Sequence, residues 1–499
     1  MSRLIIVSNR VNPPNPAEGG EGSVGGLAMA LAAALREYSG IWFGWSGKTI
    51  PEFTGQLNMQ KIEGVTVATV DLEETDYQEY YNGYANKTLW PLFHYRVDLT
   101  AYDRSFGEGY ERVNKRFAET LLPLIEPDDI VWVHDYHLIP LAKELRRMGV
   151  TNRIGFFLHI PWPAHQLVTT LPRHRQLVEA LFDYDLIGFQ TEESLHAFEG
   201  YVFSEVHGSK TERGELQAFG RKLQASAFPI GVDAKDFAEI MKGETARKVY
   251  DRMMAHSVFR KMVVGVDRLD YSKGLEERLI GFERFLKDHP DMRREVMLLQ
   301  IAPLSRDEVE AYQDLRTRLD GLIGHINGAY AEMDFTPIRY VNRSYRRDEL
   351  AGVYRAAKAA LVTPLRDGMN LVAKEYVAAQ DPEDPGVLIL SRFAGAARQM
   401  KEALIINPNS PEEISDALER ALSMDVSERK RRWEALFDNV NREDVTAWRD
   451  NFVAALRARP GPGDGEGVVA NEEEPPVRSL DVASKALRAQ GPEAKAMRA

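Results

Sequence analysis

The chain has 499 residues, of which 44% are hydrophobic and 28% are charged, and its formal net charge is −12. This is the composition of a globular protein that is too long for a single hydrophobic core, so we expect two domains and a tail. The acidic balance argues against nucleic acid or an anionic membrane surface as a partner, because either one requires a basic face.

Cysteine is absent from the sequence, which excludes disulfides, a thiolate nucleophile and a cysteine-ligated metal. The first apolar run, residues 4–7, is too short for a signal peptide, and no later run is long enough to span a membrane. We therefore expect a cytoplasmic protein.

Short apolar runs rich in Val, Ile and Phe alternate with longer amphipathic stretches along most of the chain. This alternation is typical of strands and helices that build a parallel sheet, and it predicts an α/β fold. A first series of strands is predicted at residues 4–8, 130–134, 154–159, 186–190 and 228–232. A second series, with a helix such as 275–286 between its strands, is predicted at residues 262–266, 296–301, 338–341, 359–363 and 387–390.

The two series are separated by a charged helical stretch, where we place a hinge. Residues 1–235 form the predicted first lobe and residues 236–458 the second, with the last helix packing back on the first lobe. From about Pro460 the sequence is rich in Pro, Gly and acidic residues and cannot bury enough apolar surface to become ordered. Residues 459–499 are therefore predicted to be a disordered tail, and a short docking helix at 479–487 is the alternative.

A glycine-rich segment near the start matches a dinucleotide-binding fingerprint at residues 20–25. In an NAD site this pattern follows the first strand directly, whereas here an Asn-Pro-Pro-Asn-Pro insertion intervenes, and the second strand ends in Lys48 rather than in an acid. NAD binding is therefore disfavoured. We interpret the segment as a loop whose amides at Gly25 and Gly26 face an anionic ligand, with Arg10 at its edge.

Two patterns resemble metal-binding motifs. His134 and His137 are three residues apart, and Asp183 and Asp185 form an Asp-x-Asp pair. Neither pair has a further ligand nearby in the sequence, and a zinc site needs three or four ligands that converge. Capping or strand-end roles explain these residues better, so we predict no metal and no other cofactor.

The most informative segment, residues 263–274, runs from a predicted buried strand into a loop and then into a helix. The loop carries Arg268 and Lys273 and ends at Gly274. Two cations beside a strand end are suited to a phosphate group. A surface salt bridge with a neighbouring aspartate is the alternative explanation.

A second strand-to-helix junction lies at residues 360–375. It combines a turn at Gly368, a helix N-terminus and two carboxylates, Asp367 and Glu375, eight positions apart. Amides at a helix N-terminus bind anions, and carboxylates accept hydrogen bonds from sugar hydroxyls. Together the two junctions predict a pocket for a nucleotide diphosphate sugar. Helix capping by Asp367 with a solvated Glu375 is the alternative.

The sequence resembles the bacterial trehalose-6-phosphate synthases over about residues 2–456. These are retaining glycosyltransferases with two facing Rossmann-like lobes and the active site in the cleft between them. Besides the two junctions, the resemblance rests on the motifs at residues 7–10, 43–47, 89–95, 132–138 and 157–161.

The resemblance implies transfer of glucose, with retention, from UDP-glucose to glucose 6-phosphate, which gives α,α-trehalose 6-phosphate and UDP. The donor's base is not settled by the residues, so GDP and ADP stay open. Arg268 and Lys273 can absorb the charge of the leaving group without a metal, so we expect a metal-independent enzyme. The expected partners are these two small-molecule substrates and further copies of the chain in a homo-oligomer, a tetramer by resemblance. Retention usually indicates a covalent intermediate on an Asp or Glu nucleophile, and we find no carboxylate to nominate for that role. The resemblance implies a front-face mechanism instead, and the residues themselves leave both routes open.

The resemblance assigns the donor side residue by residue. His159 contacts the donor sugar, although a satisfied core histidine is the competing account, and Asp367 accepts hydrogen bonds from glucose hydroxyls. Glu375 holds the ribose diol. Arg268 and Lys273 absorb the charge of the leaving group. The amides that point at the diphosphate belong to Gly368, Met369, Asn370 and Leu371.

The acceptor side is assigned in the same way. The resemblance implies that Arg10, Tyr81 and Arg306 bind the phosphate of glucose 6-phosphate. It also implies that Asp135 accepts a hydroxyl hydrogen bond and that aromatic walls pack against the sugar. We assign those walls to Trp45 and Trp90, for which a purely structural core role is the alternative.

Three rival functions are weighed against this one: a sister synthase with an acceptor such as glycerol 3-phosphate, a catalytically silent sugar-phosphate sensor, and an NAD-dependent oxidoreductase. A sister enzyme should lack part of the glucose-binding wall, and a silent sensor should lack Arg268, Lys273 or Glu375. All of these residues are present. No Asp-x-Asp-Gly-Thr phosphatase motif is found, so another protein should remove the product's phosphate.

Overall fold

The computed structural model describes residues 3–11, 35, 40–62, 64–256, 260–306 and 309–459. Residues 1–462 form one compact unit, which contains both of the sheets described below. The predictions for residues 20–25, for Gly26, for the helix at 479–487 and for the tail beyond Arg459 lie outside the described residues. Among the described residues no helix is both long and apolar enough to cross a membrane.

The first sheet has the strand order β3-β4-β2-β1-β5-β6-β7-β10-β9-β8 within the described part of the chain. The strands from β4 to β10 run parallel, while β3, β9 and β8 add antiparallel edges. The strands span β1 Leu4–Arg10, β2 Ile41–Ile50, β3 Asn58–Ile62, β4 Val65–Glu73, β5 Ile130–His134, β6 Arg153–Phe157, β7 Leu186–Phe189, β8 Ser209–Lys210, β9 Leu216–Ala218 and β10 Arg221–Ala227.

The second sheet is parallel throughout, in the order β13-β12-β11-β14-β15-β16. Numbered within the sheet this is 3-2-1-4-5-6, the order of a doubly wound Rossmann-type fold. Ligands bind such sheets where the strand order reverses, here between β11 and β14. The strands span β11 Lys261–Val266, β12 Val296–Ile301, β13 Ile338–Val341, β14 Ala359–Val362, β15 Val387–Ser391 and β16 Leu404–Ile406.

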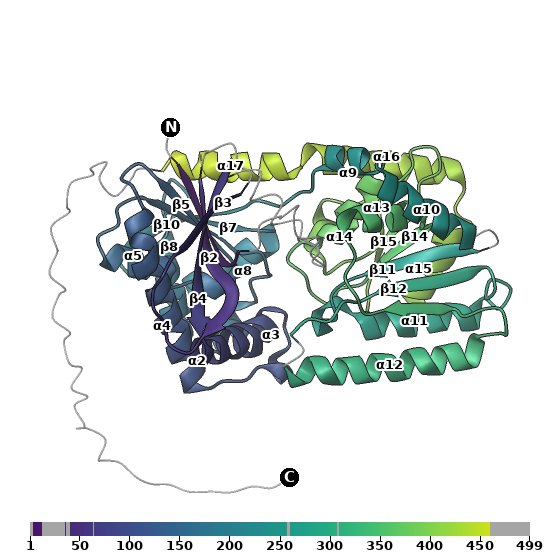
Figure 1. Cartoon of the computed structure of the whole chain (residues 1–499), viewed down its shortest axis with the longest axis horizontal. Coiled ribbons are helices and arrows are strands. Elements are labelled where there is room, and N and C mark those ends of the chain that lie inside the picture. Colours follow the sequence, from purple (N-terminus) through teal and green to yellow (C-terminus); the bar gives the residue numbers. More distant parts are fainter. Residues whose placement is uncertain are drawn as a thin grey trace, which may run out of the picture. The chain divides into compact units, whose positions relative to one another are not determined.

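Helices cover both faces of the second sheet, as Figure 1 shows. On one face lie α11, α12 and α15, and on the other α10, α13 and α14, which packs against α9 and α16. Alternate residues of each strand face the two layers, so Val263 and Val264 of β11 belong to different hydrophobic clusters. The helices span α9 Ala234–Ile240, α10 Glu244–His256, α11 Leu275–Asp288, α12 Glu310–Tyr330, α13 Arg347–Ala356, α14 Leu371–Ala379, α15 Pro411–Ser423 and α16 Val426–Arg442, with the 3₁₀ turns η5 Tyr271–Lys273 and η6 Gly395–Arg398.

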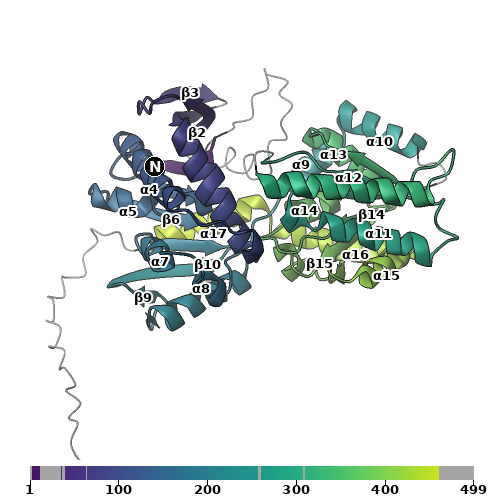
Figure 2. The ribbon, with the colours of Figure 1, turned by 90° about the horizontal axis from the view of Figure 1, so that it is seen from below.

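The first sheet is also covered on both faces, with α4 in front of it and α17 behind it in Figure 2. A π-helix, η1, carries the residues between α2 and α3. The helices span α2 Glu74–Asp76, η1 Tyr77–Leu89, α3 Trp90–Phe93, η2 Val97–Leu99, α4 Arg104–Leu121, η3 Leu122–Leu124, η4 Tyr136–Leu138, α5 Leu141–Arg147, α6 His165–Val168, α7 His174–Leu181, α8 Glu192–Glu205 and α17 Val445–Arg457.

The predicted α/β fold with two Rossmann-like lobes is confirmed, and nine of the ten predicted strands coincide with observed strands to within two residues at either end. The prediction of a strand at residues 228–232 is wrong, because the strand β10 precedes this range and ends at Ala227. Residues 228–232 are apolar for another reason. Ile230 and Val232 are buried where the chain crosses to the second sheet, and a Cβ atom at Gly231 would lie 2.1 Å from the carbonyl oxygen of Glu443.

The last described helix, α17, packs on the first sheet. Its Phe452 stacks on Trp132 with ring centroids 4.5 Å apart and an interplanar angle of 10°. Gly155 and Gly188 leave room for this ring, since a Cβ atom at either would lie 2.8 Å from it. The chain therefore crosses between the two sheets twice. The division at residues 235 and 236 stays a prediction.

The α17 contact should contribute substantially to stability. Phe452 is fully buried, so we expect Phe452→Ala to lower the free energy of unfolding by about 3–5 kcal/mol, because it removes a packed ring and leaves a cavity. The control is Phe203→Ala on α8, where the ring is 41% exposed and the expected loss is below about 1 kcal/mol. Urea denaturation would measure both, and equal losses would contradict this packing role for α17.

Candidate active site

A cavity of about 520 Å³ opens at the C-terminal ends of β11 and β14, at the point where the second sheet's strand order reverses. Three residues of the first lobe's half of the chain, His159, Gln190 and Ile230, complete its wall. The structure thus brings together the predicted donor-side residues His159, Arg268, Lys273, Asp367, Met369, Asn370, Leu371 and Glu375.

The two strand-to-helix junctions touch through their backbones. Gly274 has φ of 61°, and a Cβ atom there would lie 2.0 Å from the carbonyl oxygen of Thr363. The hydroxyl of Thr363 donates a hydrogen bond of 2.9 Å to the carbonyl oxygen of Gly274, and the amide of Leu365 donates one of 2.8 Å to that of Ser272. This contact fixes the loop after β11 against the end of β14, and only glycine fits at position 274.

The contact places Lys273 beside Asp367. The Lys273 Nζ atom lies 2.5 Å from Asp367 Oδ2, and both side chains are almost buried. Burial alone would raise the pKa of Asp367, but the adjacent ammonium group outweighs it and the pKa lies below its usual value. Asn370 adds a hydrogen bond of 3.1 Å from Nδ2 to the same oxygen. Asp367 is therefore held as a carboxylate at the cavity wall.

A buried arginine holds the strand ends from behind. Arg278 of α11 is fully buried and donates to Asp267 Oδ2 at 2.5 Å, to Gln300 Oε1 at 3.0 Å and to Thr363 Oγ1 at 3.0 Å. It thereby ties together the ends of β11, β12 and β14. A buried ion pair with all its hydrogen bonds satisfied orients its neighbours rigidly.

Arg268 is left without a close carboxylate partner among the described residues. Asp267 is engaged by Arg278, and the nearest oxygen of Asp270 is 3.9 Å from Arg268 Nη2. The Arg268 side chain is 48% exposed and its guanidinium lies 5.6 Å from the ring centroid of Trp90. The alternative of a surface salt bridge is therefore weakly supported, and the group is available to an anion.

The N-terminus of α14 borders the same cavity. Asn370 caps it with φ of 78°, accepting a hydrogen bond from the amide of Ala373 at 3.2 Å. Gly368 lies so close to the first half of the chain that a Cβ atom there would be 2.0 Å from the carbonyl oxygen of His159. Glu375 lies in the second turn of the helix, and desolvation raises its pKa while Arg347 opposes the shift.

The protonation of His159 can be assigned from its partners. The Oε1 atom of Gln190 accepts a hydrogen bond from the amide of Ile230 at 3.0 Å, so its Nε2 atom faces His159 Nδ1 at 3.3 Å. Because the Gln190 amide nitrogen donates, Nδ1 of His159 must accept, so the ring proton of neutral His159 is on its Nε2 atom. That Nε2 atom lies 3.0 Å from Nδ1 of His134. Burial lowers the pKa of His159 to about 3, so the ring is neutral.

Ile230, in the crossover between the two sheets, is also bound by a residue of the second lobe. The fully buried Lys374 of α14 donates 2.7 Å hydrogen bonds from Nζ to the carbonyl oxygen of Ile230 and to Gln399 Oε1. Burial lowers the pKa of Lys374 to about 7. Ile230 thus connects α14, the helix that carries Glu375, to the hydrogen-bond network around His159.

The predicted acceptor residues do not line this cavity but lie beside it. Arg306, with φ of 52°, is nearly buried and bridges two parts of the chain. It donates from Nη1 to Asp270 Oδ2 at 3.2 Å and from Nη2 to the hydroxyl of Tyr136 at 3.2 Å, and its guanidinium lies 3.8 Å from the ring centroid of Trp90. Burial would raise the pKa of Asp270, but the Arg306, Arg268 and Lys273 cations lower it to about 2.

The remaining acceptor residues form a second group near the end of β1. Trp45 and Tyr81 have ring centroids 5.6 Å apart, and the Arg10 guanidinium lies 5.8 Å from the Trp45 ring. His137 links this group to the first one, because it stacks on Tyr81 at 5.9 Å and contacts Tyr136 at 3.9 Å. The predicted acceptor residues thus belong to one continuous aromatic cluster.

Asp135 lies at the end of β5 with φ of 74°, a conformation that costs free energy for any residue other than glycine. Its carboxylate accepts a hydrogen bond from the amide of His159 at 3.2 Å. This bond joins the predicted acceptor residues to the predicted donor residue His159. Burial raises the pKa of Asp135 to about 6. Strained backbone at a strand end is common at functional sites.

The residues that resemble metal ligands are engaged elsewhere. His134 faces His159, while Asp185 accepts from Arg146 Nη2 at 2.9 Å and from the amide of Ile154 at 2.7 Å. Asp183 pairs with Arg221 at 3.3 Å. Within the described ranges no group of three His, Asp or Glu side chains converges as metal ligands do.

Sequence reasoning did not single out several residues that organise the site. Arg278 and Lys374 are cations inside helices whose neighbours are apolar, and this pattern is a usable signal, because such cations are rarely buried without partners. For Gln190 and Tyr136 the only signal was their position, since Gln190 is the last residue of the strand predicted at 186–190 and Tyr136 lies two residues after the strand predicted at 130–134.

The fold and the cavity define the class of this protein: a two-lobed enzyme with the B-type glycosyltransferase fold. A family model described as glycosyltransferase family 20 matches residues 2–458. The chain belongs to this family.

Relatives and solved structures match nearly the whole chain. A trehalose-6-phosphate synthase of Sinorhizobium fredii is 49% identical over 460 residues, which are 92% of this chain and 99% of the relative. The crystal structure of a UDP-forming α,α-trehalose-phosphate synthase from Burkholderia xenovorans, in complex with glucose 6-phosphate, is 50% identical with a TM-score of 0.86, covering 91% of this chain and 100% of that one. A structure from E. coli bound with UDP-2-fluoro glucose is 44% identical with a TM-score of 0.88, covering 92% and 100%.

The protonation of His159 is testable by spectroscopy. We expect ¹⁵N spectra of histidine-labelled protein to show an unprotonated Nδ1 for His159 and no titration between about pH 5 and pH 8. In Gln190→Glu a carboxylate replaces the amide donor, which should draw a proton to Nδ1 and raise the pKa of His159. Gln190→Met, which removes the donor without adding charge, should not raise that pKa. A wild-type His159 protonated on Nδ1 would contradict the assigned network.

Proposed function

We propose that this protein is a UDP-forming α,α-trehalose-phosphate synthase, which transfers glucose from UDP-glucose to the anomeric oxygen of glucose 6-phosphate with retention. The observation that carries the proposal is the arrangement around Asp270. A cavity with Arg268 and Lys273 at a strand-order reversal adjoins an aromatic cluster containing the nearly buried Arg306. Membership of glycosyltransferase family 20 supports the same function.

The donor diphosphate fits the cavity's cations. As the bond between C1 of glucose and the β-phosphate oxygen breaks, its electron pair leaves with UDP, and negative charge grows on that phosphate. Arg268 and Lys273 stabilise this charge, at roughly 3 kcal/mol of barrier for each fixed contact in a water-poor site. Amides at the N-terminus of α14 face the same group.

The rest of the donor is held by groups on the cavity wall. Asp367, kept ionised by Lys273, accepts hydrogen bonds from glucose hydroxyls, and Glu375 accepts both hydroxyls of the ribose. The neutral His159 contacts the sugar. UDP is the proposed nucleotide because the relatives are named as UDP-forming enzymes.

The acceptor binds in the aromatic cluster. Arg10, Tyr81 and Arg306 bind the phosphate of glucose 6-phosphate, since a guanidinium fork suits a phosphate dianion. Trp45 and Trp90 pack against the sugar, and Asp135 accepts a hydroxyl hydrogen bond. Bound in this way, the anomeric hydroxyl lies near the donor's C1 atom.

The reaction then follows a front-face route. The departing phosphate oxygen takes the proton of the acceptor hydroxyl, while the acceptor oxygen forms a bond to C1 on the face that the phosphate has left. Substrate oxygen thereby serves as the base, and no protein nucleophile is needed. The two lobes enclose the substrates and exclude water, which would otherwise hydrolyse the donor.

A matrix of substrates tests this function. We expect UDP-glucose with glucose 6-phosphate to release nucleotide at least tenfold faster than any other combination of UDP-, ADP- or GDP-glucose with glucose 6-phosphate or glycerol 3-phosphate. Faster release with glycerol 3-phosphate would establish a sister synthase instead. If no acceptor stimulated release from any donor while glucose 6-phosphate still bound, the protein would be a silent sensor.

A further inference from the structure

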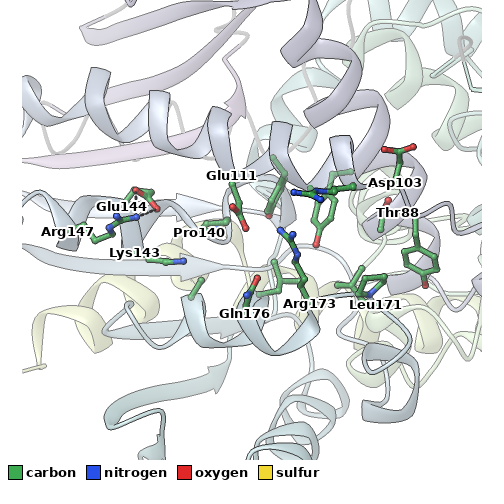
Figure 3. A pocket seen from close by; sticks show the side chains of 18 residues that line it. Thr88, Asp103, Glu111, Pro140, Lys143, Glu144, Arg147, Leu171, Arg173 and Gln176 are labelled. Carbon is green, nitrogen blue, oxygen red and sulfur yellow. Dashed lines mark hydrogen bonds and ion pairs between the residues drawn. The ribbon is translucent and has the colours of Figure 1, made fainter.

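A second cavity, of about 350 Å³, lies wholly within the first lobe and shares no lining residue with the candidate active site. It opens between α4, α5 and α7, next to the second half of η1 (Figure 3). Nothing in the proposed reaction uses it. Its lining combines an aromatic and aliphatic floor with charged groups of both signs.

The floor is formed by two tyrosines. The rings of Tyr84 and Tyr110 have centroids 4.4 Å apart and are tilted by 35°. Leu171, Leu177 and Ala180 continue this surface. Aromatic faces beside small aliphatic groups pack well against the C–H face of a sugar ring.

Two cations of the lining have no carboxylate partner among the described residues. Neither Lys143 nor Arg173 makes a hydrogen bond through its side chain or an ion pair within the described part of the chain, unlike Arg104, which pairs with Glu108 at 2.7 Å. Arg173 also has φ of 61°, a conformation disfavoured for a residue with a side chain. An unpaired cation on strained backbone beside a cavity points to an anionic ligand.

Polar groups that accept hydrogen bonds face the same space. In Figure 3 the side chains of Glu111, Arg173 and Gln176 extend toward one another across the cavity. A carboxylate suits the hydroxyls of a sugar, but it repels a polyphosphate chain. The lining therefore favours a ligand with one phosphate group and several hydroxyls over a nucleotide.

We propose that this cavity is a second, non-catalytic binding site for a sugar phosphate. Its phosphate binds Lys143 and Arg173, its hydroxyls bind Glu111 and Gln176, and its ring packs on the tyrosine floor. Because sugar monophosphates are also the acceptor and the product of the proposed reaction, the site would let such a compound act as an effector.

The floor is connected to the acceptor side of the active site. The hydroxyl of Tyr110 donates a hydrogen bond of 2.6 Å to the carbonyl oxygen of Tyr136 and accepts one of 3.3 Å from the amide of Ile139. Tyr136 in turn accepts from Arg306, and its neighbour Asp135 has strained backbone. A ligand packed on Tyr110 therefore steadies the loop at residues 135–139 from behind.

Binding stoichiometry tests the proposal. Equilibrium dialysis with labelled glucose 6-phosphate, in the presence of UDP, should give two equivalents per chain for the wild type. Arg306→Ala, which weakens the acceptor site, should retain one. The double variant Lys143→Gln, Arg173→Gly should also bind one, because it removes both cations and glycine accepts the φ of residue 173. The matched control Lys235→Gln, Arg213→Gly makes the same changes at exposed positions and should bind two.

The outcomes separate this site from the proposed function. If the wild type bound only one equivalent of glucose 6-phosphate, and if Lys143→Gln, Arg173→Gly did not change that number, the second site would be overturned. This holds whatever the substrate matrix gives. Glucose and inorganic phosphate alone should each bind the cavity at least tenfold more weakly than glucose 6-phosphate, and equal binding of phosphate would overturn the sugar contacts. Hydrogen exchange of Arg306→Ala should slow at residues 135–139 on addition of glucose 6-phosphate, and unchanged exchange there would overturn the connection through Tyr110.

Discussion

The candidate active site depends on the backbone contact between Gly274 and Thr363. Two loops almost ninety residues apart in sequence touch there, and the glycine's positive φ and missing Cβ atom make the approach sterically accessible. Arg278 reinforces the contact from the buried side by binding Asp267 and Thr363. Both junctions are therefore fixed by the sheet and by this contact, which hold their side chains in defined mutual positions.

This constraint sets the charges of the cavity. Asp367 is neutralised by Lys273, and Asp267 by Arg278, so Arg268 is the cation with the weakest internal compensation among the described residues that line the cavity. In the proposed reaction a diphosphate therefore meets a positive site that is already oriented, and little free energy is needed to arrange it as charge develops. On the proposed acceptor side Arg306 and Asp270 form the corresponding pair, so fixed ion pairs border both of the proposed substrate sites.

The sequence predicted those features that are local. Buried parallel strands such as β5 and β12 appear as continuous apolar runs. Arg268 and Lys273, which the strand-to-loop junction singled out, line the cavity at the end of β11. The run at 228–232 failed because burial at a crossover gives the same apolar pattern as a strand. The sequence carries a signal that Arg278 and Lys374 are buried, but the partners of Arg278, Gln190 and Lys374 could not be predicted. Those partners depend on which strand ends meet, and this is set by topology rather than by neighbouring residues.

The central claim is that fixed protein cations stabilise the leaving nucleotide. The most direct measurement is the turnover number of Arg268→Gln and Lys273→Met with saturating UDP-glucose and glucose 6-phosphate, with and without EDTA, beside the control Lys401→Met at an exposed lysine. We expect each cavity variant to lose about 10²–10³ in kcat, the control to keep the wild-type value, and EDTA to change nothing. The claim would be contradicted by wild-type turnover in the double variant Arg268→Gln, Lys273→Met, or by reversible loss of activity in EDTA.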